Sequence, residues 1–334
     1  MASSAENNIY LSFFMFTTDL RPEDREYTKL VVRHMEAMRE LGYTGFDLPI
    51  APRDTLDHER ELESYVKLRQ ALDDAGLGDV RFTTNTFATR TFDPSSMYEE
   101  QRAIALSYLK SRVDITKALG ADIMAGPIVL PYNVFPATNF NETIWSDALQ
   151  DWLSLRYEHA QPVFEALGEY AARQGVKLAI EPVAHWETPG PNLVSDVVRF
   201  LDKVASPQVG VCIDSAQVML GSEGPAATTS AVEHVLAARR LHYVQMSPPD
   251  RGALTDSWIA WKPFLEPILK GYDGPFLVEV FNAIGVFPNL LRLTRRKFLI
   301  PGEDTLDPNR PNAYDVAREA IATLRHEIAQ GSCS

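Results

Sequence analysis

The chain has 334 residues, of which 45% are hydrophobic and 23% charged, so it can bury the core of one large domain or two average ones. Its formal net charge of −13 argues against a nucleic-acid partner or an anionic membrane surface, since both attract concentrated Lys and Arg. Its two cysteines make no disulfide framework, no apolar run reaches the length of a membrane span, and residues 1–8 lack the features of a secretory signal, so we expect a cytoplasmic protein.

Apolar runs bounded by Gly, Pro and polar residues predict eight strands. In chain order they cover residues 9–16, 44–50, 80–87, 121–128, 177–183, 209–214, 242–247 and 275–281. Amphipathic stretches between them predict helices. Three of these stretches, residues 27–42, 64–77 and 107–120, have apolar residues at helical spacing and a glycine at or near the end.

Eight strand–helix units without a break in composition predict a single (β/α)8 TIM barrel of the α/β class over residues 1–334, with residues 1–8 as a disordered tail. An open doubly wound sheet would alternate in the same way. It usually carries a glycine-rich phosphate-binding turn after its first strand, and no such turn follows residue 16.

Two predicted loops are longer than a barrel needs. They are residues 128–147, after the fourth strand, and the insertion 282–311, after the eighth. Loops at the carboxyl ends of barrel strands commonly shape the substrate pocket, and the aromatic residues of these two suit a partly apolar lid. A subunit contact is an equal alternative for residues 282–311.

Four apolar runs in the second half of the chain end in a residue with an oxygen ligand for a hard metal ion: Glu181, Asp214, Gln245 and Glu279. Their spacings of 33, 31 and 34 residues are close to one strand plus one returning helix. Because all strands of a parallel barrel end at one mouth, we expect the four side chains to converge on a metal ion there. Taken singly, each carboxylate could instead cap a helix or form an ion pair, and Gln245 could bond a neighbouring backbone group.

This all-oxygen ligand set favours Mg²⁺, Mn²⁺ or Co²⁺ over zinc, and the neutral amide of Gln245 is its weakest member. Glu181 and Glu279 come from strands five and eight, so a chelated substrate between them would have one carboxylate on each face. Such a pair could remove a proton from one side and return it to the other, while the ion polarises a carbonyl and stabilises the enediolate. This is the mechanics of epimerisation beside a ketone.

At these residues the sequence resembles the tagatose and allulose (psicose) 3-epimerase group of the xylose-isomerase-like sugar isomerase/epimerase barrels. The resemblance extends over most of the chain. Its most specific parts are GVKLAIEPVAHWET (175–188), PQVGVCIDSAQ (207–217), SPPDRG (247–252) and GYDGPFLVEVF (271–281). It implies a site for Mn²⁺ or Co²⁺ at Glu181, Asp214, Gln245 and Glu279, with Glu181 and Glu279 as the catalytic acid/base pair.

The resemblance also implies substrate contacts outside the metal set. Glu187 would hold a substrate hydroxyl, Arg251 a substrate oxygen, and Gln217 would take the place of a substrate-binding histidine. A salt bridge at the rim for Glu187 and a solvated loop cation for Arg251 are the alternatives. His185, four residues after Glu181, could serve as an acid for a leaving group.

The chain departs from the family pattern at three positions, since Gln245 and Gln217 stand where the family has His, and Pro248 where it has Glu. We therefore expect a keto-sugar or an oxidised sugar derivative as substrate, and doubt a simple free ketohexose. A lyase of the same superfamily is the alternative, similar to the C-glycoside deglycosidases that cleave 3-oxo-glycosides or to the 3-dehydroshikimate dehydratases. A barrel that binds sugar without catalysis is a third. Analogy with the epimerases suggests a homodimer or homotetramer.

Overall fold

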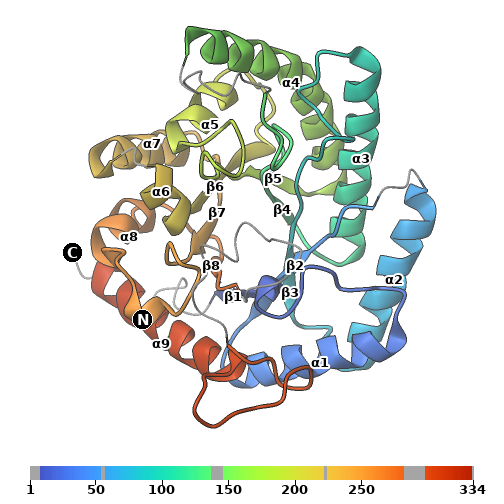
Figure 1. The fold of residues 1–334 in the computed structure, drawn as a ribbon, viewed down its shortest axis with the longest axis vertical. Coiled ribbons are helices and arrows are strands. Elements are labelled where there is room, and N and C mark those ends of the chain that lie inside the picture. Colours follow the sequence, from blue (N-terminus) through green and yellow to red (C-terminus); the bar gives the residue numbers. More distant parts are fainter. Residues whose placement is uncertain (1–7, 54–56, 137–145, 222–223, 282–297, 333–334) are drawn as a thin grey trace.

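Eight parallel strands form a closed barrel in which each strand pairs with the next and β8 pairs with β1 (Figure 1). The structure is a computed structural model that describes residues 8–53, 57–136, 146–221, 224–281 and 298–332. The strands are β1 (Ile9–Ser12), β2 (Gly45–Pro49), β3 (Arg81–Asn85), β4 (Ile123–Gly126), β5 (Lys177–Ile180), β6 (Val209–Asp214), β7 (Leu241–Met246) and β8 (Phe276–Val278). The predicted TIM barrel is confirmed.

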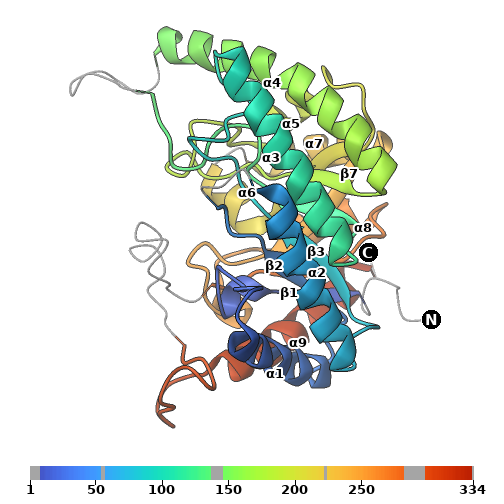
Figure 2. The same ribbon diagram turned by 90° about the vertical axis from the view of Figure 1, so that its right-hand side faces the viewer.

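Helices surround the strands as an outer layer, and Figure 2 shows α2, α3 and α4 side by side. The helices are α1 (Arg25–Glu40), α2 (His58–Asp74), α3 (Glu99–Ala118), α4 (Asp147–Gln174), α5 (Val194–Leu201), α6 (Ser215–Gly221), α7 (Pro225–Ala237), α8 (Trp261–Leu269) and α9 (Ala313–Ser332). Local chemistry sets their ends. The Asp24 side chain caps the start of α1 by accepting from the backbone N–H groups of Glu26 and Tyr27, and Gly175, at φ 70°, ends α4. Within the described residues, no helix has the length and apolar content needed to span a membrane.

The first strand is shorter than its apolar run predicts. β1 ends at Ser12, and a 3-10 helix, η2 (Phe13–Met15), follows it. The Ser12 hydroxyl accepts from the Phe14 N–H at 3.3 Å, and the Phe13 ring meets the Phe46 ring edge-on at 5.9 Å. The prediction that residues 13–16 continue the strand is therefore wrong. These apolar residues are buried because they pack in a helical turn after the strand, not because they extend it.

The two long loops are described only in part. Residues 137–145 of the first and 282–297 of the second lie outside the described residues, as does the predicted tail apart from Asn8. In the second loop, Phe298, Leu299 and Ile300 are buried in the core, and Glu303 accepts a hydrogen bond from Tyr27 of α1 at 3.5 Å. The last part of the predicted insertion is therefore packed against the barrel's helices.

The interior of the barrel contains a buried carboxyl group. Asp47 on β2 accepts a hydrogen bond from the Thr83 hydroxyl at 2.6 Å, and this hydroxyl also bonds the Tyr243 hydroxyl at 2.8 Å. Because β3 and β7 are not neighbours, the second bond must cross the interior. The other oxygen of Asp47, Oδ2, has no hydrogen-bond partner among the described residues. Burial raises the pKa of Asp47 from 3.8 to about 7, although the hydrogen bonds act in the opposite direction.

Replacing Asp47 should change how stability depends on pH. A carboxyl group whose pKa is raised by folding contributes stability below its unfolded pKa, and that stability is lost as the pH rises through about 7. Asp47→Asn keeps the side-chain shape but cannot ionise, so it does not lose this stability. The melting temperature of the variant minus that of wild type should therefore increase from about pH 4 to about pH 8. The corresponding change in unfolding free energy is at most roughly 4 kcal/mol. Thermal melts at both pH values test this, with the exposed Asp151→Asn as control. An equal pH dependence in wild type and Asp47→Asn would contradict it.

Candidate functional site

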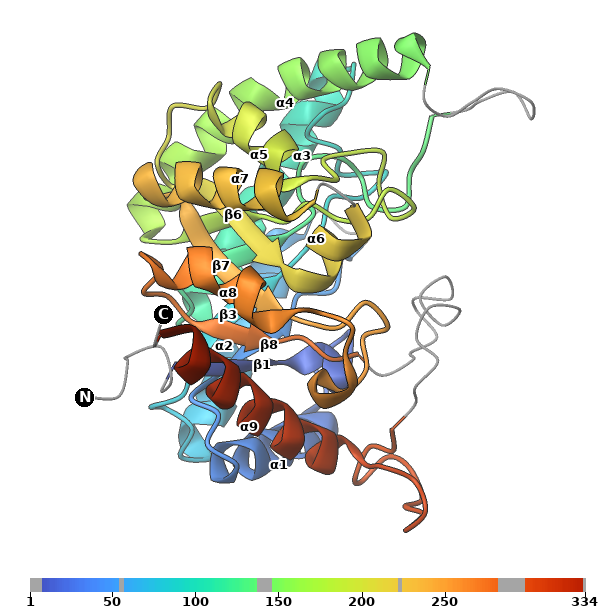
Figure 3. The ribbon, with the colours of Figure 1, turned by 90° about the vertical axis from the view of Figure 1, so that its left-hand side faces the viewer.

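Three carboxylates meet at the carboxyl ends of the barrel strands. Glu181 directly follows β5, Asp214 is the last residue of β6, and Glu279 directly follows β8. One oxygen from each lies within 4.8 Å of the others, and all three side chains are buried. The strands bring them together because a closed parallel barrel directs equivalent strand ends to one mouth. Figure 3 shows this end of the barrel from the side, with α6 and the loop between β7 and α8 beside it.

Gln245 lies on the strand next to Asp214 and is its register partner. It is fully buried, and neither its Oε1 nor its Nε2 has a hydrogen-bond partner among the described residues. A buried amide without partners is unfavourable, typically by about 1–3 kcal/mol for each unmet group. Its carbonyl oxygen is therefore available to a ligand that the protein itself does not supply.

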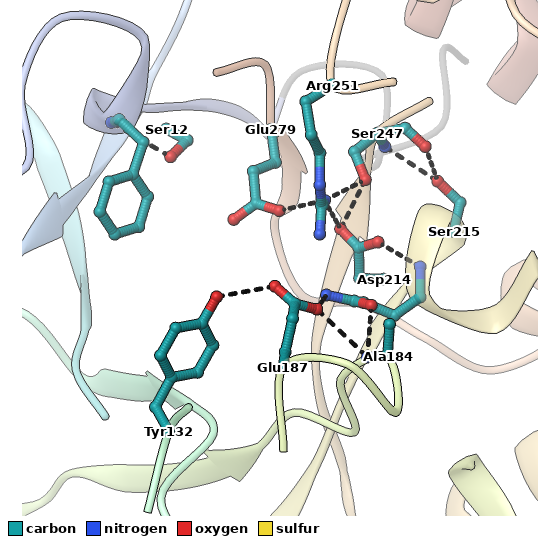
Figure 4. Close-up of polar contacts among 11 residues, drawn as sticks. Ser12, Tyr132, Ala184, Glu187, Asp214, Ser215, Ser247, Arg251 and Glu279 are labelled. Carbon is teal, nitrogen blue, oxygen red and sulfur yellow. Dashed lines mark hydrogen bonds and ion pairs between the residues drawn. The ribbon is translucent and has the colours of Figure 1, made fainter. Parts of the chain in front are cut away.

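Arg251, in the loop after β7, places its guanidinium group on the carboxylates (Figure 4). Its Nη1 donates to Glu279 Oε2 at 2.7 Å, to Asp214 Oδ2 at 3.1 Å and to the Ser247 hydroxyl at 2.7 Å. The guanidinium carbon also lies 5.0 Å from the centre of the Phe281 ring. Burial lowers the pKa of Arg251, but the surrounding carboxylates outweigh it and raise the pKa, so the group is charged. Binding of a substrate oxygen by Arg251 stays a prediction.

Burial also disfavours ionisation of Glu181 and Glu279. Desolvation raises the pKa of Glu181 well above its ordinary value, and the neighbouring Asp214 carboxylate raises it further. Desolvation raises the pKa of Glu279 in the same way; Arg251 acts against this, and Asp214 and Glu181 add to it. Glu181 and Glu279 come from β5 and β8, and two such buried carboxyl groups can act as proton donor and proton acceptor.

Glu187 lies beside this group in the loop after β5 and is held by three donors (Figure 4). The Tyr132 hydroxyl donates to Oε1 at 2.8 Å, while Gln217 Nε2 and the Ala184 N–H donate to Oε2 at 2.9 and 3.2 Å. The Asn133 N–H also donates to the backbone carbonyl of Glu187 at 2.6 Å. Among the residues that the structure describes, Glu187 forms no salt bridge, and its carboxylate links the loops after β4 and β5 to α6.

Tyr132 is a site residue that sequence reasoning missed. It lies in the first long loop, whose aromatic content is typical of a pocket wall, but nothing in the sequence identifies this tyrosine as the partner of Glu187. Its ring also contacts Phe87, with the ring centres 5.5 Å apart. The hydrogen bond joins two loops that are far apart in sequence, which local patterns do not reveal.

His185 lies in the loop after β5 and lines a surface cleft. Its side chain is exposed, stands edge-on to the Trp186 ring at 4.9 Å and lines a cleft with residues of α4 and α5, including Tyr157. No contact within the described residues connects it to Glu181, Asp214 or Glu279. Its role as an acid for a leaving group stays a prediction.

The residues fit a divalent cation. Among the closest groups, three carboxylates face the single positive charge of Arg251, so two negative charges are left uncompensated when all are ionised. Gln245 adds an unpartnered amide oxygen next to Asp214. A hard cation such as Mn²⁺ or Mg²⁺ prefers such oxygen ligands and would satisfy both the charge and the amide.

A parallel (β/α)8 barrel with acidic groups at its strand ends is the architecture of many barrel enzymes. The chain belongs to the xylose isomerase-like TIM barrel family, whose family model matches residues 35–304. The predicted membership of this family is confirmed, and so is a distant homology to ketose 3-epimerases.

Three relatives illustrate the comparison. A crystal structure from Anabaena variabilis, described only as a candidate sugar phosphate isomerase/epimerase, is 57% identical with a TM-score of 0.94, covering 97% of this chain and 99% of that one. The L-ribulose 3-epimerase of Methylomonas sp. (strain DH-1) is 25% identical over 54% of this chain and 58% of its own length. The D-allulose 3-epimerase of Methylomonas sp. in complex with D-allulose is 18% identical with a TM-score of 0.73, covering 98% of this chain and 99% of that one, which shows the fold alone. The chain spans about half the length of the curated relatives it matches.

Proposed function

We propose that this protein is a divalent-metal-dependent sugar isomerase or epimerase that moves a proton at the carbon beside a sugar carbonyl. The observation that carries the proposal is the buried group Glu181, Asp214 and Glu279, with oxygens within 4.8 Å of one another. The unpartnered amide of Gln245 beside it supports the same proposal. The names of the ketose 3-epimerase relatives agree with this chemistry.

We assign metal-binding, proton-transfer and substrate-binding roles to the residues of the proposed site. Glu181, Asp214, Gln245 and Glu279 would hold the cation, preferably Mn²⁺, which when bound supplies a Lewis acid that polarises a substrate carbonyl. Glu181 and Glu279 would remove the proton beside that carbonyl and return it, each from its own side. In the metal-free protein, burial raises the pKa of both carboxyl groups. Glu187 would hold a substrate hydroxyl.

Product analysis tests the proposal. The purified protein, stripped of metal and reloaded with Mn²⁺, is incubated with ketopentoses, ketohexoses, their phosphates and 3-oxo-glycosides, and the products are separated by chromatography. Conversion of any of these into a sugar isomer supports the proposal. Release of an aglycone or of water would assign the barrel to the lyases of the superfamily, and no conversion by metal-loaded protein would favour a sugar-binding barrel.

A change at position 245 should alter metal affinity in a defined direction. An imidazole nitrogen is a stronger ligand for Mn²⁺ or Co²⁺ than a neutral amide oxygen, and His is close to Gln in size. Gln245→His should therefore lower the Kd for either ion roughly tenfold, equivalent to about 1.4 kcal/mol. Isothermal titration of metal-free protein measures this, with wild type as reference. An unchanged or weaker affinity would remove Gln245 from the proposed ligand set.

A further inference from the structure

The side chain of Gln217 is occupied by protein partners. Its Nε2 donates to Glu187 Oε2 at 2.9 Å, its Oε1 accepts from the Ala184 N–H at 2.8 Å, and its own backbone N–H donates to Asp214 Oδ1 at 2.8 Å. The residue is only 2% exposed. Gln217 lies in α6, which begins directly after Asp214, so one residue contacts both a proposed metal ligand and the carboxylate beside it.

The bonds around Gln217 form a closed ring. The Ala184 N–H also donates to Glu187 Oε2 at 3.2 Å, so Ala184, Gln217 and Glu187 are each bonded to the other two. Chemistry dictates the orientation of the amide, because a backbone N–H needs an acceptor and a carboxylate needs a donor. The Tyr132 hydroxyl holds the other carboxylate oxygen at 2.8 Å. The Glu187 carboxylate is thereby fixed in both position and rotation.

We propose that Gln217 is a positioning residue that sets Glu187 at a defined place relative to Asp214, and that it does not itself contact the substrate. The inference rests on the proposed function, in which Glu187 binds the substrate hydroxyl. It adds that Gln217 holds the Glu187 carboxylate in position. Gln217 is only 2% exposed and both of its side-chain polar atoms have protein partners, which supports a positioning role.

A charge introduced at position 217 tests the ring without any assay of activity. Gln217→Glu keeps the acceptor for Ala184 but turns a carboxylate oxygen toward Glu187, and two adjacent carboxylates are compatible only while they share a proton. Folding therefore raises the pKa of the carboxyl pair formed by position 217 and Glu187. The folded variant is stable at low pH, where the pair shares a proton, and loses stability as the pH rises. We expect a melting temperature near that of wild type at about pH 5 and at least about 3 °C lower at about pH 8. The exposed Gln150→Glu is the matched control and should show no such difference.

A double-mutant cycle tests whether Gln217 acts through Glu187. Gln217→Met has similar length but no hydrogen-bonding groups, so it should lower kcat/KM about tenfold or more, because Glu187 is no longer held in place for the substrate hydroxyl. In the Glu187→Gln background the same substitution should add little further loss, because the group that Gln217 positions is already changed. If Gln217 contacted the substrate directly, the losses of the two single variants would multiply in the double variant, and that result would overturn the proposal.

The two tests separate this inference from the proposed function. If wild-type protein converts no sugar, the proposed function fails, and the melting data for Gln217→Glu still decide whether the ring exists. A melting temperature of Gln217→Glu that follows the control at both pH values would overturn the ring even in an active enzyme.

Discussion

Glu181→Gln and Glu279→Gln will each lower turnover by about 10²–10⁴-fold at saturating Mn²⁺, because each removes a proton-transfer group from one side of the substrate. Both substitutions preserve side-chain shape, and each also removes one anionic metal ligand. Turnover must therefore be compared at metal concentrations that saturate each variant. Steady-state kinetics with the sugar that wild type converts provides the measurement.

The control for these variants is Glu169→Gln, an exposed position on α4, which should keep wild-type turnover. Melting temperatures of both site variants should be no lower than that of wild type in metal-free protein, because burial disfavours the charges that the substitutions remove. Wild-type turnover by either site variant would exclude a mechanism with two acid/base carboxyl groups.

Removing the metal should abolish activity, and restoring Mn²⁺ should recover it. The pH dependence of metal binding follows from the raised pKa values of Glu181 and Glu279 in the metal-free protein. Both groups must be ionised to bind a cation, so binding releases protons and affinity rises with pH until both groups are ionised. Calorimetric titration in buffers of different ionisation enthalpy counts the released protons.

A substitution of one proposed metal ligand provides a second test of the metal centre. Asp214→Asn removes a fully buried proposed ligand that ends β6 and should weaken Mn²⁺ binding by at least about tenfold. Activity that survives exhaustive chelation, or an affinity that does not change with pH, would contradict the proposed metal centre.

The barrel was predictable because its signals are local and repeated. Each apolar run is bounded by polar residues and followed by an amphipathic stretch, and parallel pairing then places equivalent strand ends at one mouth. The convergence of Glu181, Asp214 and Glu279 follows from the spacing of these runs. The error at residues 13–16 shows the limit of this signal, because an apolar run is buried equally well in a strand or in a turn that covers the barrel end.

The polar contacts of the site were not predictable in the same way. Pairing of Tyr132 with Glu187 depends on how two loops fold across the barrel mouth, and no periodic pattern encodes it. Resemblance to sugar epimerases implies that Gln217 and Arg251 contact the substrate, but it does not reveal their hydrogen bonds to Glu187, Asp214 and Glu279. A resemblance transfers positions along the chain, but the partner of each side chain depends on every neighbour, including those that have changed.

Exchange of solvent deuterium tests the central claim most directly. The Mn²⁺-loaded protein is incubated in D₂O with the sugar panel, and NMR follows deuterium incorporation and the carbon skeleton. We expect deuterium at the carbon beside the carbonyl of a sugar whose skeleton is intact, and we expect this signal to be lost after chelation and in Glu279→Gln. Sugar conversion without deuterium from solvent and unaffected by chelation would contradict it.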